Sequence, residues 1–355
     1  MDVTGHARKR TPLADEAATA VRPASIRDVA ATAGVSYQTV SRVINGSPRV
    51  KDATRELVQS AIDQLGFRPN RAARALAGGP VQSITVLTAD TTLYGYAATL
   101  QGIEEAARAA DFTVGVRVLD SAAPADVRNA VDRATESAGA LVVVAFDKAG
   151  IDALAAVPPD IPMVAAVENP VGNQGAGQPW VWIDDRKAAM DATNYLLELG
   201  HRTVHHVSIP SASKKAQRLA GWRSALVAAG IKPPKPQYAI WHARSGYEAG
   251  QALARDPEVS AVLCGNDDLA FGVLRAMHEA GRAVPDDVSI IGFDDIPLAE
   301  FATPALTTVR LDWAELGRTC FRLLRERMHD PDTVLSGPPP QLVVRESTGP
   351  ARRTP

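Results

Sequence analysis

Several polar side chains in residues 36–43 have the types and spacing that recognition of DNA requires. On a helix, residues three and four apart lie on one side, so the hydroxyl, amide and guanidinium groups of this stretch would form a single polar face. Such groups can bond the base edges and phosphates of a major groove. The residues of this face are Tyr37, Gln38, Ser41 and Arg42. The opposite face, with Val40, Val43 and Ile44, is apolar and would pack on a core.

Two acidic pairs and one histidine pair could also do chemistry. Asp267-Asp268 and Asp294-Asp295 each follow an apolar, strand-like segment, a position that suits either acid–base catalysis or hydrogen bonding to a ligand. His205-His206 falls within a predicted strand, where successive side chains point to opposite faces, so we expect one histidine in the core and one at the surface. The sequence has no GxSxG, HExxH, P-loop or GxGxxG motif. We therefore expect no enzymatic activity, no cofactor and no bound metal.

Two short helices joined by a glycine turn must position the polar face. The first is expected at residues 26–33, directly after Ser25. Asp28 follows Ser25 by three positions, which is the spacing of a capping box. The turn at Gly34-Val35 leads into the second helix, which carries the polar face. This order of elements predicts a helix-turn-helix.

A third helix is expected at residues 52–65, with Leu57, Ala61 and Leu65 in a core shared by all three helices and Gly66 at its end. Such a core is near the lower size limit for independent stability. Helix pairs around a glycine also occur in all-helical domains that bind no DNA, so this pattern alone leaves both interpretations open.

The sequence from residue 28 to residue 79 resembles the lactose-repressor (LacI/GalR) family of transcriptional regulators. The matching segments are Asp28-Val29-Ala30, Ala33-Gly34-Val35-Ser36, Thr39-Val40-Ser41-Arg42-Val43, Pro69-Asn70-Arg71 and Leu76-Ala77-Gly78. Tyr37-Gln38 is similar to the repressor that gives the family its name. The resemblance implies an N-terminal all-α helix-turn-helix headpiece in which Tyr37, Gln38, Ser41 and Arg42 face the major groove.

The resemblance also implies roles for residues outside the second helix. Asn45, Arg49 and Asn70 would lie near the DNA backbone. Residues 70–77 would form a hinge helix only on DNA and beside the same helix of a second subunit, because two helical turns alone are marginal in water. Leu76 of that helix would enter the minor groove. The alternative for this segment is a plain interdomain linker.

From residue 81 onward, apolar strands alternate with amphipathic helices, which predicts parallel sheets in doubly wound domains. Strands are expected at 84–87, 113–118, 140–145, 163–167, 203–209, 238–241, 261–264 and 288–293, and helices at 100–110 and 190–199. By resemblance, this is an α/β type I periplasmic-binding-protein-like core of two doubly wound parallel-sheet lobes. Its ligand is expected between the lobes, at the carboxyl ends of strands.

The expected domain boundaries follow from these patterns and the resemblance. They are a disordered arm at 1–24, the headpiece at 25–69, the hinge helix and linker at 70–79, the core at 80–350 and a tail at 351–355. Within the core, lobe 1 would comprise about 80–183 and 313–340, and lobe 2 about 184–312 and 341–350.

Five residues that match the family are expected to bind a small effector in the cleft. They are Arg218, Trp241, Asn266, Asp294 and Trp313. A guanidinium facing a carboxylate can hold vicinal hydroxyls, an asparagine adds a donor and an acceptor, and an indole covers an apolar sugar face. The effector is therefore expected to be a mono- or disaccharide. The alternatives are a solvated helix position for Arg218 and a core position for Trp241.

Charge and composition limit the classes of function. The chain of 355 residues has a formal net charge of −2, but residues 1–79 carry +5 and the remainder −7, so positive charge lies where phosphates would be contacted. No apolar run is long enough to span a bilayer, and the first 24 residues lack a signal-peptide core, which predicts a cytoplasmic protein without membrane contact. Cys264 and Cys320 are expected to be buried free thiols.

These observations together predict a homodimeric transcriptional repressor that binds operator double-stranded DNA and responds to a sugar. The first alternative is a periplasmic-type sugar-binding protein without regulatory DNA binding, which the basic headpiece opposes. The second is an α/β enzyme, which would need a catalytic constellation.

Overall fold

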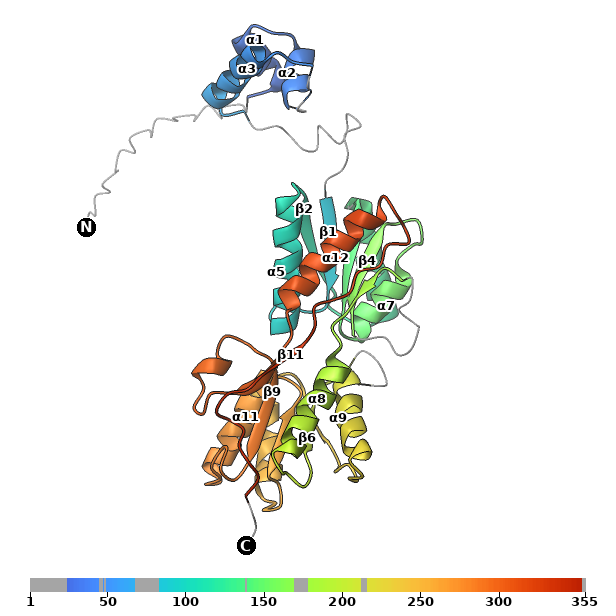
Figure 1. Cartoon of the computed structure of the whole chain (residues 1–355). Helices are drawn as coiled ribbons and strands as arrows, with labels where there is room; N and C mark the ends of the chain where they lie inside the picture. The colour runs from blue at the N-terminus through green and yellow to red at the C-terminus, as the bar shows by residue number, and fades with distance from the viewer. Residues whose placement is uncertain are drawn as a thin grey trace, which may run out of the picture. The chain divides into compact units, whose positions relative to one another are not determined.

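The computed structural model describes residues 24–44, 47, 49–67, 83–137, 139–168, 178–211 and 216–352. The chain forms two compact units, Met1–Pro80 and Val81–Pro355 (Figure 1). The predictions for Asn45, Asn70, Leu76, the N-terminal arm and the hinge helix lie outside the described residues.

Three helices form the first unit, and local signals set their ends. α1 (Ile26–Ala33) begins with the expected capping box, in which the Ser25 side chain accepts from the Asp28 N–H and the Asp28 carboxylate accepts from the Ser25 N–H. Gly34 (φ 66°) ends α1 in left-handed backbone, which glycine adopts without strain. α2 (Tyr37–Ile44) follows, and α3 (Asp52–Leu65) ends at Gly66 in the same conformation.

One small apolar core holds these helices together. Its buried residues are Val29, Ala30, Val40, Val43, Val58 and Ala61. Leu57 is 57% exposed, so the prediction that it belongs to this core is wrong. Val58 takes its place because Val58, Ala61, Ile62 and Leu65 form the i, i+3, i+4, i+7 stripe that packs on the other two helices.

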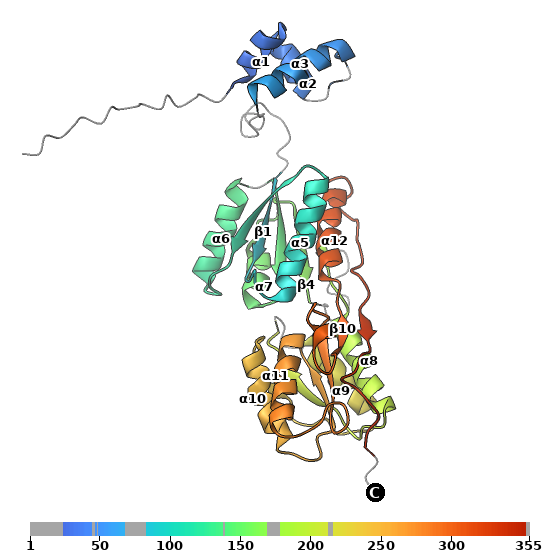
Figure 2. The same ribbon diagram turned by 90° about the vertical axis from the view of Figure 1, so that its left-hand side faces the viewer.

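Lobe 1 is a parallel five-stranded sheet with the order β2-β1-β3-β4-β5. Its strands are β1 (Ser83–Thr88), β2 (Thr113–Val118), β3 (Ala140–Ala145), β4 (Met163–Val167) and β5 (Trp180–Val181). The connecting helices are α5 (Tyr94–Ala109), α6 (Pro124–Ser137) and α7 (Lys148–Ala156). Figure 2 shows α6 on one side of this sheet and α5 on the other. Because both faces are covered, β3 is buried along its whole length.

Lobe 2 is a six-stranded sheet with the order β11-β10-β9-β8-β6-β7, parallel except for the pair of β10 and β11. Its strands are β6 (His205–Ser208), β7 (Gln237–Tyr238), β8 (Ala261–Cys264), β9 (Ser289–Asp294), β10 (Thr307–Arg310) and β11 (Gln341–Val343). Its helices are α8 (Asp185–Glu198), α9 (Gln217–Ala228), α10 (Ala243–Ala254), α11 (Asp267–Glu279) and the 3-10 turn η2 (Ala299–Phe301).

The C-terminal segment belongs to both lobes. After β10 the chain returns to lobe 1, where α12 (Trp313–Arg327) packs beside α5 in the core that also contains Ile84 and Val86 (Figures 1 and 2). It then crosses back to lobe 2 as β11, which pairs antiparallel with β10. The chain therefore passes between the two lobes several times. These connections restrict how the lobes move relative to each other.

Two glycines allow close packing of α5 against α12. A Cβ at Gly102 would lie 1.9 Å from the Ala314 carbonyl oxygen, and one at Gly317 would lie 2.1 Å from the Thr99 carbonyl oxygen. Any side chain at either position would push the two helices apart, since backbone cannot yield as a flexible side chain does.

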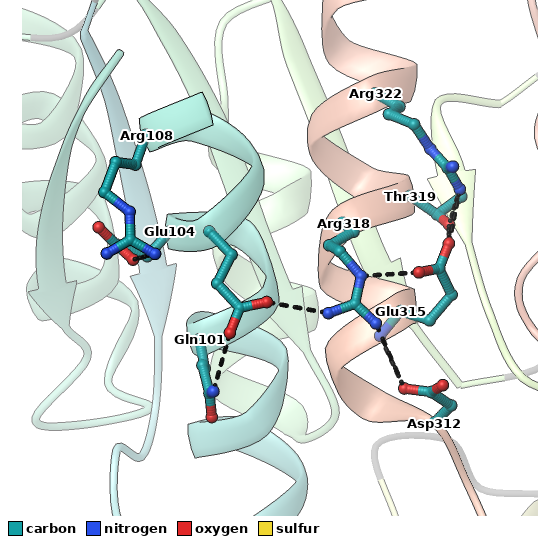
Figure 3. Close-up of polar contacts among 9 residues, drawn as sticks. Gln101, Glu104, Arg108, Asp312, Glu315, Arg318, Thr319 and Arg322 are labelled. Atoms are coloured by element: carbon teal, nitrogen blue, oxygen red, sulfur yellow. Dashed lines mark hydrogen bonds and ion pairs between the residues drawn. The ribbon is translucent and has the colours of Figure 1, made fainter. Parts of the chain in front are cut away.

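Charged groups bridge the same helix pair. Arg318 of α12 donates to Glu105 of α5 (Nη1···Oε2 2.9 Å). It also donates to Glu315 on its own helix (Nε···Oε2 2.7 Å), and Figure 3 shows this contact. This packing fixes the first turn of α12, where Trp313 lies against Gly95 of α5.

Most expected strands are present, and the differences occur at short or polar segments. The strand expected at 238–241 is only the two-residue edge strand β7, and the strands β5, β10 and β11 were not predicted. The helices expected at 100–110 and 190–199 begin earlier, at Tyr94 and at Asp185, where Asp184 caps α8. Cys264 and Cys320 are buried free thiols, as predicted. No helix in the described ranges is long and apolar enough to cross a membrane.

Candidate functional site

A cavity lies where lobe 1 and lobe 2 meet, and all five expected effector residues line it: Arg218, Trp241, Asn266, Asp294 and Trp313. Most of the cavity-lining residues that belong to a strand, or directly follow one, lie at the carboxyl end of that strand. Glu168 follows β4, Ser208 ends β6 and Asp294 ends β9. Parallel strands place their carboxyl ends at one edge of a sheet, so the two lobes direct their strand ends into one space.

Arg218 forms the charged centre of the cavity. It lies in the first turn of α9 and is 8% exposed, so it is not a solvated helix residue. Its guanidinium has Asp185 on one side (Nε···Oδ2 3.5 Å) and Asp294 on the other (Nη2···Oδ1 3.5 Å). Its Nη1 donates to the Gly265 carbonyl oxygen, and its Cζ lies 4.7 Å from the centroid of the Phe293 ring.

Two buried polar atoms of this centre lack a hydrogen bond. Asp185 Oδ1 and Arg218 Nε have no hydrogen-bond partner among the described residues. A buried polar group without a partner costs free energy, so such groups in a native structure point to a missing partner. Both residues line the cavity.

Burial also changes the acidity of the two carboxyl groups. It raises the pKa of Asp185 to about 7, against the opposing effect of the Arg218 guanidinium. It raises the pKa of Asp294 as well, although Arg218 and a hydrogen bond from Trp313 act in the other direction. A carboxyl group that can be protonated near neutral pH can donate as well as accept a hydrogen bond.

Aromatic rings form much of the cavity wall. Trp241 is partly exposed and lines the cavity, so the alternative of a core tryptophan is wrong. Trp313 donates from Nε1 to Asp294 Oδ1 (3.2 Å), and its ring centroid lies 5.1 Å from that of Phe146. Phe146 in turn packs edge-on against Tyr96. Trp180 and Trp182, in contrast, pack on the lobe 1 core and are not among the described lining residues.

Asn266 has a structural task in addition to lining the cavity. It caps α11, where its Oδ1 accepts from the Leu269 N–H (2.9 Å) and its Nδ2 donates to the Trp241 carbonyl oxygen (3.0 Å). Much of the hydrogen-bonding capacity that the sequence suggested for a ligand is therefore used within the protein. Its neighbour Asp267 is buried behind the cavity and accepts from Thr308 Oγ1 (2.5 Å).

Some lining residues were not among the predicted effector residues. Asp185, in the first turn of α8, could pass for an ordinary helix-start acid, and no sequence signal distinguishes it from Asp184. Glu168 of lobe 1 accepts from Ser211 Oγ of lobe 2 (2.7 Å), and its position directly after an apolar strand is the signal that could have identified it. His206 is buried and stacks on Trp222, and neither it nor the partly exposed His205 lines the cavity.

The polar face of α2 is open to solvent in the headpiece. Tyr37, Gln38 and Arg42 are exposed, whereas Ser41 is partly buried between them and the core. Arg49, beyond the second helix, is also exposed. The exposed groups are a phenol, an amide and two guanidinium groups, which suit base edges and phosphates.

Comparisons with known proteins agree with both units. A model described as bacterial regulatory proteins, lacI family, matches residues 25–70, and one described as a periplasmic binding protein-like domain matches residues 193–348. Catabolite control protein A of Priestia megaterium is 30% identical over 334 residues, which cover 91% of this chain and 99% of the relative.

Solved structures give the same result. A lac repressor dimer bound to operator and the anti-inducer ONPF superposes with a TM-score of 0.83 at 29% identity, covering 92% of this chain and 100% of that one. A complex of the transcriptional regulator CelR with cellobiose gives a TM-score of 0.66 at 30% identity, covering 91% and 99%. The predicted fold class, a helix-turn-helix headpiece with two parallel-sheet α/β lobes, is thus confirmed. The chain belongs to the lacI family of bacterial regulatory proteins, which are not enzymes, and is a DNA-binding transcriptional regulator with an effector-binding core.

Proposed function

We propose that this regulator binds a near-palindromic operator as a homodimer and that a mono- or disaccharide between the lobes lowers its affinity for that operator. The observation that carries the effector assignment is the charged centre formed by Arg218 with Asp185 and Asp294, all three of which line a cavity with aromatic walls. Sugar hydroxyls donate and accept at once, so they suit a site that offers both a guanidinium and carboxyl groups.

The cavity wall supports a sugar over a purely polar metabolite. Trp241, Trp313 and Phe146 offer flat apolar surface, and pyranose rings present flat C–H faces that pack on such surface. The solved CelR structure contains cellobiose, and a lacI-family regulator from Enterococcus faecium contains ribose. A planar nucleobase could also stack on these rings, so it is the alternative that a binding experiment must include.

The exposed face of α2 supports the assignment of DNA contacts. Tyr37, Gln38, Ser41 and Arg42 would read base edges in the major groove, and Arg49 would contact the DNA backbone. The proposed backbone contacts of Asn45 and Asn70 and the minor-groove position of Leu76 rest on the family resemblance alone. The lac repressor is bound to its operator as a dimer.

Exposed apolar groups support a homodimer. β2 is an edge strand with Val116 and Val118 exposed, and an unpaired edge of this kind favours association. In lobe 2, Leu298 and Phe301 are 64% and 74% exposed next to each other around η2. Such neighbouring large apolar side chains on a surface indicate a contact with another chain.

The dimer is tested by Phe301→Glu, which places a charge in the proposed interface. We expect sedimentation velocity to show a dimer for the parent and a monomer-rich population for this variant. Val227→Glu, at an apolar position on α9 that is 60% exposed, is the matched control and should remain dimeric. A Phe301→Glu protein that stays dimeric at low micromolar concentration would place the interface elsewhere.

The effector class is tested by native mass spectrometry and calorimetry with glucose, galactose, ribose, cellobiose, lactose, adenine and hypoxanthine. We expect at least one sugar to bind the parent, and Arg218→Met to lose that binding because it removes the charged centre of the cavity. Tight binding of a purine, with none of a sugar, would replace the sugar by a nucleobase as the effector.

A further inference from the structure

The backbone at the end of β9 adopts an unusual conformation. Asp294 has a φ of 102° and Asp295 a φ of 52°. Aspartate tolerates the left-handed backbone conformation that Asp295 adopts. The φ of Asp294 is larger than that conformation allows, and residues other than glycine are rare at such values. Strained backbone of this kind persists only where the surroundings hold it in place. Here it directs the Asp294 carboxylate to Arg218 and to the Trp313 indole.

The Asp295 side chain is held between two arginines. Its Oδ2 accepts from Arg310 (Nε 2.7 Å, Nη2 2.6 Å), at the end of the neighbouring strand β10. Its Oδ1 accepts from Arg345 Nη2 (2.7 Å), which lies just beyond β11. The Asp295 carboxylate is only 6% exposed, and Arg345 is fixed in turn by donating from Nη1 to the Leu306 carbonyl oxygen (2.8 Å). Charge-assisted hydrogen bonds of this length are stronger than those between neutral groups.

A second set of contacts holds the backbone after the turn. The Ile296 N–H donates to Asp267 Oδ2 (2.8 Å), and the Asp295 N–H makes a longer contact with Thr308 Oγ1 (3.4 Å). The turn is thus tied to β10, to the start of α11 and to the C-terminal segment. None of Asp295, Arg310 and Arg345 is among the described residues that line the cavity.

We propose that Asp295 is a positioning residue: through its ion pairs with Arg310 and Arg345 it holds Asp294 in the strained conformation that presents its carboxylate to the effector. Asp295 therefore sets the affinity of the cavity without contacting the effector. The consequence for affinity rests on the function proposed above, whereas the consequence for the geometry of Asp294 does not.

The geometric part is tested without any ligand. Trp313 donates its indole N–H to Asp294, so the indole signal of protein labelled with ¹⁵N-tryptophan reports where that carboxylate lies. It is assigned as the signal missing from Trp313→Phe. Asp295→Asn keeps the size and the left-handed tolerance of the side chain but removes its charge. We expect the Trp313 signal to move toward its position in Asp294→Ala.

Controls separate positioning from damage to the fold. Glu279→Gln removes a carboxylate from a solvent-exposed ion pair with Arg275 in the same lobe and should leave the Trp313 signal in place. If Asp295→Asn does not fold, Arg310→Gln, at a half-exposed side chain, removes one of the two ion pairs and should move the signal in the same direction. A Trp313 signal that stays at the parent position in a folded Asp295→Asn or Arg310→Gln variant would overturn the proposal.

The affinity part is tested by a double-mutant cycle with the sugar of the panel above that binds the parent most tightly. We expect Asp295→Asn to weaken binding about tenfold, because the hydroxyls bound by Asp294 lose their partner. In the Asp294→Asn background the same change should have almost no further effect. Additive losses would show a general structural role and overturn the proposal. If no sugar binds the parent, the proposed function fails, and the indole signal still decides the positioning role.

Discussion

Replacement of Asp185 by asparagine should remove a pH dependence from the stability of the core. Burial raises the pKa of this carboxyl group to about 7, compared with about 3.9 in an unfolded chain. A raised pKa means that the folded state binds the proton more tightly than the unfolded chain does. The resulting stabilisation of the folded state is complete below about pH 4 and is lost as the pH rises through 7. The amide of the variant cannot bind such a proton.

The size of the effect follows from the two pKa values. Between pH 5 and pH 8 the linkage relation gives a loss of about 2 to 3 kcal/mol in the free energy of unfolding of the parent from this group alone. The variant lacks that loss, because its amide beside Arg218 carries no charge at either pH. The expected result is that Asp185→Asn becomes more stable relative to the parent by about 2 to 3 kcal/mol on going from pH 5 to pH 8.

Urea unfolding followed by tryptophan fluorescence measures this difference, because Trp222 is fully buried in lobe 2. Asp191→Asn, on the same helix but in an exposed pair with Lys187, is the control and should track the parent at both pH values. An equal stability difference between parent and Asp185→Asn at pH 5 and at pH 8 would refute the idea that Asp185 is a buried, neutralised acid.

Two further predictions concern the headpiece and the helix pair of lobe 1. Arg42→Ala should weaken operator binding by roughly 1 to 3 kcal/mol and random-duplex binding much less, as measured by fluorescence anisotropy; equal losses on both DNAs would mean that Arg42 contacts only phosphate. Gly102→Ala should lower the free energy of unfolding by about 1 to 3 kcal/mol, because its Cβ would lie 1.9 Å from the Ala314 carbonyl oxygen. Gly115→Ala, where the nearest atom is 3.5 Å away, should cost much less, and equal costs would contradict the packing of α5 on α12.

The sequence predicted best those elements whose ends are set by local chemistry. Ser25, Asp28, Gly34 and Gly66 lie within a few residues of the helix ends that they determine, so the headpiece helices could be placed in advance. The one misplaced core residue, Leu57, is a neighbour of the buried Val58, an error of a single position in helical register.

The site was predicted less completely because its contacts are remote in sequence. Arg218 was selected by family resemblance, since nothing in its own helix distinguishes a buried guanidinium from a solvated one. Its partner Asp185 lies 33 positions earlier in the chain and was missed. Asp295 meets Arg310 because β9 and β10 are neighbouring strands, and it meets Arg345 only because the C-terminal segment returns to lobe 2 as β11.

In the proposed function, occupancy of the inter-lobe cavity changes the affinity of the protein for DNA. Reciprocal coupling of about 1 to 3 kcal/mol is typical, so a saturating sugar should raise the operator Kd by roughly 5- to 150-fold. Because the phosphate contribution depends on salt, the parent and Arg218→Met must be compared at one fixed salt concentration.

An operator titration with and without the sugar that binds the parent measures this coupling between cavity and DNA. We expect the parent to release operator when sugar is added. We expect Arg218→Met to bind operator as tightly as the parent and not to be released by the same sugar concentration. Tighter operator binding by the parent in the presence of sugar would make the sugar a corepressor, and normal release of Arg218→Met would contradict the assignment of the cavity as the regulatory site.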